Sequence, residues 1–87
     1  MTLHDIHKTL KSTLDITCQR FVNCNNVTSY RHSGEYIFLN APENGVLKMS
    51  VYPSGVTSLA PELAISLGLK CVRSEASGLN TFELRSD

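Results

Sequence analysis

Histidine and cysteine side chains are the first candidates for chemistry in this chain of 87 residues. His4 and His7 stand three positions apart, a spacing that puts both imidazoles on one face of a helix, where they could hold a metal ion. A metal site needs a third and usually a fourth ligand, and neither Cys18 nor Cys24 stands at the spacing of a zinc-binding motif. We therefore expect an exposed histidine pair, with no bound metal and no cofactor.

Cysteine and carboxylate catalysis have equally little support in the pattern. A cysteine nucleophile needs a histidine base and an electropositive setting. Cys18 instead falls on the apolar face of a predicted helix and Cys71 in a predicted strand, where cysteine commonly serves as a small buried side chain. The acidic residues are scattered singly, and the glycines stand at predicted turns and helix ends rather than in a phosphate-binding run. The sequence predicts a protein that is not an enzyme.

Composition excludes several further classes of protein. Eight Lys and Arg residues balance eight Asp and Glu residues, so bulk charge favours neither a protein that coats duplex DNA nor an acidic DNA mimic. The longest apolar runs, such as residues 36–39, are far shorter than the roughly 20 residues that span a membrane, and residues 3–8 do not form the apolar stretch of a secretory signal. Three cysteines, an odd number, fit a reducing compartment. We expect a cytoplasmic protein with free thiols and no membrane contact.

Periodicity indicates the elements that would position these side chains. Apolar residues recur at three- and four-residue steps over residues 3–22, which predicts a helix that begins with Thr2 and Asp5 as its cap. A shorter helix over residues 59–67 would be capped by Thr57 or Ser58 and stopped at Gly68. Strands with intervening turns are expected at residues 27–31, 35–41, 46–52, 70–74 and 79–85.

This order, α-β-β-β-α-β-β, predicts one α+β domain over residues 1–87, with a mainly antiparallel sheet and two helices packed against it. Residues 36–39 are apolar on both faces, which indicates a central strand whose second face is also covered. If both helices lie on one face, that cover would come from a partner. The expected core residues are Leu10, Leu14, Phe21, Phe38, Leu47, Val51, Leu63, Leu67 and Phe82.

Two features point to nucleic acid. Residues 62–69, Glu-Leu-Ala-Ile-Ser-Leu-Gly-Leu, resemble the first helix and turn of a helix-turn-helix DNA-binding motif. That motif needs a second helix directly after the turn, whereas residues 70–74 carry strand signals, and the same segment equally suits a glycine-capped helix packed on a sheet. Alternatively, tyrosines on the sheet surface could stack on bases beside cations.

The leading hypothesis is a non-catalytic protein-binding module that acts as an inhibitor, adaptor or regulator of a partner protein, because a small neutral domain without site chemistry has mainly its surface to act with. A nucleic-acid-binding regulator is the alternative. Self-association as a homodimer is also expected, against a monomer whose helices cover opposite faces. The candidate binding residues are Tyr30, Arg31, Tyr36, Phe38, Lys48, Tyr52 and Arg73.

Overall fold

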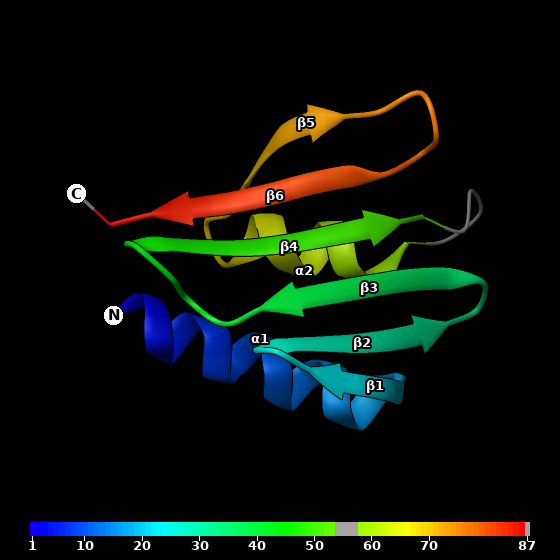
Figure 1. Cartoon of the computed structure of the whole chain (residues 1–87), viewed down its shortest axis with the longest axis horizontal. Helices are drawn as coiled ribbons and strands as arrows, with labels where there is room; N and C mark the ends of the chain where they lie inside the picture. The colour runs from blue at the N-terminus through cyan, green and yellow to red at the C-terminus, as the bar shows by residue number, and fades with distance from the viewer. Residues whose placement is uncertain (54–57, 87) are drawn as a thin grey trace.

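The computed structural model describes residues 1–53 and 58–86, and for residues 21–23 it describes the backbone alone. Within these residues the elements follow the order α-β-β-β-β-α-β-β (Figure 1). Their bounds are α1 Leu3–Thr17, β1 Gln19–Cys24, β2 Val27–His32, β3 Glu35–Asn40, β4 Val46–Tyr52, α2 Leu59–Ser66, β5 Lys70–Ser74 and β6 Asn80–Arg85.

The first helix starts where the sequence predicts and ends five residues earlier than expected. Thr2 and Asp5 form a capping box, in which the Asp5 amide donates to the Thr2 hydroxyl at 3.1 Å and the Thr2 amide donates to the Asp5 carboxylate at 3.0 Å. At the other end, Cys18 is already extended, and its amide donates to the Leu14 carbonyl. The prediction of a helix to residue 22 is therefore wrong.

The residues after α1 form strand β1, which the periodicity did not predict. β1 pairs antiparallel with β2 across Asn25 and Asn26, whose φ angles of 50° and 65° match a two-residue hairpin turn with both central residues left-handed. Asparagine tolerates this conformation better than most residues. The hairpin thus satisfies the backbone of residues 19–24 in a ladder, where a longer helix would have left β2 as an edge strand.

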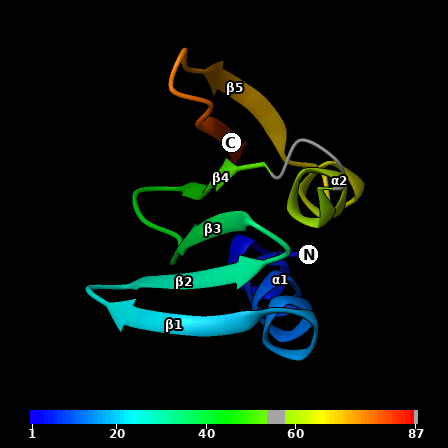
Figure 2. The same cartoon turned by 90° about the vertical axis from the view of Figure 1, so that its right-hand side faces the viewer.

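All neighbouring strands are antiparallel, in the order β1-β2-β3-β4-β6-β5. Both helices lie on the same face of this sheet, as the edge-on view shows (Figure 2). The predicted fold class, a mainly antiparallel sheet with two helices packed against it, is confirmed, with one strand more than expected. The opposite face, here called the open face, carries no helix within the described residues (Figure 1, Figure 2).

The core lies between the sheet and the two helices. The expected core residues that are buried there are Leu10, Leu14, Leu47, Val51 and Phe82. Phe38 is half-buried on the open face instead, because its neighbours Ile37 and Leu39 take the inward positions of β3. The side chain of Phe21 lies outside the described residues.

Helix α2 packs through alanines rather than through the leucines that the sequence analysis chose. Ala60 and Ala64 have no exposed surface, whereas Leu63 and Leu67 pack against the core only partly buried. Small side chains on the contact face allow a helix to approach a sheet closely, and the leucines then flank the contact. The prediction that Leu63 and Leu67 are fully buried is therefore wrong.

A buried carboxylate holds the start of α2. The side chain of Ser58, at the N-cap position, makes no capping hydrogen bond, and Thr57 lies outside the described residues. Glu35 of β3 supplies the cap instead: its two carboxylate oxygens accept the amides of Leu59 and Ala60 at 3.0 Å each. Glu35 itself is completely buried. This contact anchors α2 to β3 and satisfies two of the amides that a helix start leaves without partners.

The two edge strands are poorly suited to pairing with another chain. The register shifts between Arg20 and Val22 in β1 and between Cys71 and Arg73 in β5, as at a β-bulge. Bulges and charged side chains on edge strands oppose edge-to-edge association. Neither helix that the structure describes has the length and apolar character needed to cross a bilayer.

Candidate interaction surface

Three aromatic side chains gather at the centre of the open face. Tyr36 of β3 is paired in register with Tyr52 of β4, and both are about two-fifths exposed. Phe38, two residues along β3, meets the Tyr52 ring edge-on, with ring centroids 6.4 Å apart and planes at 82°. The aromatic cluster, defined as Tyr36, Phe38 and Tyr52, places large apolar side chains at the middle of a face that neither described helix covers.

Arg31 borders this cluster on the β2 side. It is paired in register with Tyr36 and with Gln19 of β1, so the four side chains Gln19, Arg31, Tyr36 and Tyr52 form one row across β1 to β4. The Arg31 guanidinium donates to the Gln19 side-chain oxygen at 3.1 Å. A neutral amide orients the guanidinium without neutralising it, so Arg31 keeps its full charge at the margin of the cluster.

A shallow groove of about 540 Å³ lies on the other side of the cluster, over β4, β6 and β5. Its floor includes the hydroxyl side chains of Ser50 and Thr81, which are paired in register. Charged side chains surround this floor, and two ion pairs lie among them: Arg85 contacts Glu83 at 3.0 Å, and Arg73 contacts Glu75 at 3.6 Å. Among the residues that line the groove are Lys48, Ser50, Arg73, Thr81, Glu83 and Arg85.

The register places the predicted binding residues as follows. Arg31, Tyr36, Phe38, Lys48, Tyr52 and Arg73 all lie on the open face. Tyr30 lies on the helix side with no exposed surface, and its hydroxyl donates to Asp15 of α1 at 2.8 Å. Burial and this hydrogen bond raise the pKa of Tyr30. Tyr30 is thus part of the core and is left out of the candidate surface.

The sequence analysis missed the part of the surface that β6 contributes. Thr81, Glu83 and Arg85 alternate with the inward residues Phe82 and Leu84, and each lies opposite an open-face residue of β4. The sequence shows this alternation, but the prediction used only its apolar positions, to choose core residues. The sequence did not show which strand pairs with β4. The next strand in the chain, β5, lies at the edge of the sheet, and β6 lies between β5 and β4.

Two of the cysteine and histidine candidates, Cys18 and His32, have surroundings that bear on their reactivity. Cys18 is half-buried, and burial raises the pKa of its thiol, which opposes thiolate formation. The Nδ1 atom of His32 is buried and has no hydrogen-bond partner among the described residues, while the carboxylate of Glu35 is occupied by the amides of α2. No cluster of three or more His, Cys, Asp or Glu residues in residues 1–53 and 58–86 could hold a metal ion.

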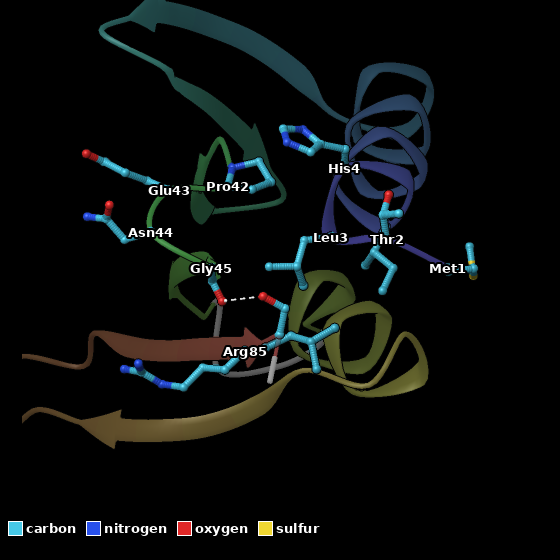
Figure 3. Close-up of a pocket in the computed structure, with 12 residues that line it drawn as sticks. Met1, Thr2, Leu3, His4, Pro42, Glu43, Asn44, Gly45 and Arg85 are labelled. Carbon is cyan, nitrogen blue, oxygen red and sulfur yellow. Dashed lines mark hydrogen bonds between the residues drawn. The ribbon is translucent and has the colours of Figure 1, made fainter.

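A second hollow, of about 590 Å³, lies between the first turn of α1 and the turn that joins β3 to β4 (Figure 3). Leu3 and His4 of the helix face Pro42 and Gly45 of that turn. The Ser86 hydroxyl closes one side through a 3.4 Å hydrogen bond to the Gly45 carbonyl. The capping box satisfies the Thr2 and Asp5 amides at this helix start, and the Glu43 carboxylate, which also lines the hollow, opposes the binding of an anion there.

Comparison of the chain with protein-family models, curated proteins and solved structures finds no match. The function proposed below therefore rests on the open face and its groove.

Proposed function

We propose that this chain is a small, non-catalytic protein-binding module that acts as an inhibitor, adaptor or regulator of a partner protein, with the open face as its binding surface. The observation that carries the proposal is the aromatic cluster. A solvent-facing side of an antiparallel sheet is ordinarily polar, and large aromatic side chains surrounded by charges are typical of the centre of a protein interface. The three thiols are free, which suits the cytoplasm as the proposed location.

The irregular edge strands favour a partner that binds the open face over a partner that adds a strand to the edge of the sheet. A partner that adds a strand needs a regular row of unpaired amides and carbonyls, and both β1 and β5 interrupt that row. A partner that covers the face needs only the exposed side chains.

Affinity capture from a native lysate tests this proposal. We expect the wild-type chain to retain a protein partner after nuclease treatment, and the Phe38→Ala/Tyr52→Ala variant to lose it. Ile65→Ala is the matched control, because Ile65 is an exposed apolar side chain on α2, away from the open face. Equal capture by both variants would reject the open face as the binding surface.

A second candidate function, binding of single-stranded nucleic acid, is favoured by the row in which Arg31 adjoins Tyr36 and Tyr52, since aromatic rings and cations together bind single strands. Nuclease treatment in the capture experiment separates protein binding from nucleic-acid binding, because loss of the captured material on treatment would support nucleic acid. The helix-turn-helix alternative lacks its second helix here, because α2 is followed by Gly68 and then by strand β5.

A further inference from the structure

The charges of this neutral chain are sorted by face. The strands of the open face carry five basic residues and one acidic residue, with two more carboxylates at the margins in Glu43 and Glu75. The basic residues are Arg31, Lys48, Lys70, Arg73 and Arg85, and the acidic residue is Glu83. The described helix side carries the opposite balance: Asp5, Asp15, Glu35 and Glu62 against Lys8, Lys11 and Arg20. The open face is thus cationic.

Part of this positive charge is uncompensated. Arg73 and Arg85 have carboxylate partners on their own surface. Arg31, Lys48 and Lys70 have none within ion-pair distance in the part of the chain that the structure describes. Arg31 and Lys48 stand on opposite sides of the aromatic cluster: Arg31 is paired with Tyr36, and Lys48 lies two residues from Ser50, which is paired with Phe38. Arg31 and Lys48, neither of which forms an ion pair among the described residues, therefore flank the apolar centre, and Glu83 lies opposite Lys48 in register.

An apolar centre with a charged rim is the arrangement of a protein interface, in which rim charges select a partner of opposite sign and accelerate its association. A second copy of this chain is the wrong partner for this face, because a symmetric face-to-face dimer would bring two cationic surfaces together. Nucleic acid is also disfavoured. The perpendicular rings of Phe38 and Tyr52 cannot both stack on successive bases.

We infer that the segment bound by the open face is an acidic polypeptide segment, with carboxylates that reach Arg31 and Lys48 and an apolar side chain that packs on the aromatic cluster. This inference rests on the proposed function and specifies the chemistry of its partner.

Nuclear magnetic resonance titration tests the inference with defined probes. The probes are a peptide of alternating glutamate and leucine, the same peptide with glutamine in place of glutamate, and an oligothymidylate. We expect the glutamate peptide to shift amide resonances of β2, β3, β4 and β6. It should also bind at least about fivefold more tightly than the glutamine peptide, because two exposed ion pairs contribute an affinity difference of about this size. Added salt should reduce this preference.

Charge reversal supplies the matched variants. Arg31→Glu/Lys48→Glu should abolish the preference for the glutamate peptide, whereas Lys8→Glu/Lys11→Glu, the same change of charge on α1, should retain it. Thermal denaturation confirms that each variant is folded. The inference is overturned if the two peptides bind equally, if the shifts map to the helices, if the oligothymidylate binds the open face more tightly than the glutamate peptide, or if the free chain already pairs through this face. Capture that depends on Phe38 and Tyr52 while the peptides bind equally would reject the acidic partner and retain the proposed function.

Discussion

Removal of the Glu35 carboxylate should uncouple α2 from the sheet. In Glu35→Ala, the amides of Leu59 and Ala60 lose their acceptors, and the Ala60 amide lies in a buried residue where water cannot replace the carboxylate. Hydrogen bonds to a charged group contribute about 1.5–3 kcal/mol each, and the half-buried Leu59 amide falls at the lower end. The free energy of unfolding should therefore fall by about 3–4 kcal/mol, a large share of the roughly 5–15 kcal/mol that small domains possess.

Urea denaturation followed by circular dichroism measures this change, with the m-value as a check that the same surface unfolds. Glu35→Gln keeps one acceptor and should lose about half as much stability. Glu62→Gln is the control: it removes a carboxylate from the first turn of the same helix, but this one is exposed, so the loss should stay below about 0.5 kcal/mol.

Hydrogen exchange separates loss of the cap from loss of packing, since the Leu59 and Ala60 amides should exchange much faster in Glu35→Ala while the β4 amides keep their order of protection. If Glu35→Ala and Glu62→Gln have the same unfolding midpoint, the reasoning that a strand carboxylate caps α2 is refuted.

Three further predictions concern ionisation, thiols and assembly. Because the pKa of Tyr30 is raised in the folded chain, above about pH 10 the unfolded chain releases this proton first, so stability should fall as pH rises there, and denaturation of Tyr30→Phe should show a smaller fall. The exposed thiols of Cys24 and Cys71 should react with a disulfide reagent before Cys18, whose pKa is raised by burial; equal rates would contradict the placement of Cys18. The homodimer expected through the face of residues 36–39 stays a prediction: twice the chain mass of 9.6 kDa by light scattering, lost on replacement of Tyr36 or Phe38 by a charged residue, would support it, although the like charge of the open faces opposes this pairing. A mass of 9.6 kDa at every concentration would reject it.

The sequence predicted the elements that have strong local signals. The Thr2–Asp5 capping box and the alternation of β4 are determined by residues within a few positions of one another, and both are confirmed. Strand β1 was missed because residues 19–24 continue the apolar spacing of α1, and what makes them a strand is their pairing with β2. Two adjacent asparagines at residues 25 and 26 were the available signal for that hairpin.

The cap of α2 shows a different limit. Sequence reasoning looked for it among the residues just before the helix, at Thr57 and Ser58, because N-caps are local in most helices. Glu35 lies 24 residues before Leu59, and only the packing of α2 against β3 brings the carboxylate to the helix start. An acidic residue at the start of a strand of otherwise apolar character has no partner that spacing alone can identify.

The positions that β3 and β4 contribute to the candidate surface were predictable, whereas the contribution of β6 and the charge of the face were not. Alternation assigns Tyr36 and Phe38 to the outward face of β3, and it assigns Lys48 to the outward face of β4. Neither assignment depends on the order of the strands in the sheet. The net charge of zero suggested that electrostatics would select no partner. Charges act at distances of about 8 Å at physiological salt, so their effect depends on which face they share rather than on the total. The pairing of β4 with β6, and of β6 with β5, adds Lys70 to the face that already holds Arg31 and Lys48, together with the ion pairs that Arg73 and Arg85 form there. A neutral chain thereby acquires a cationic face.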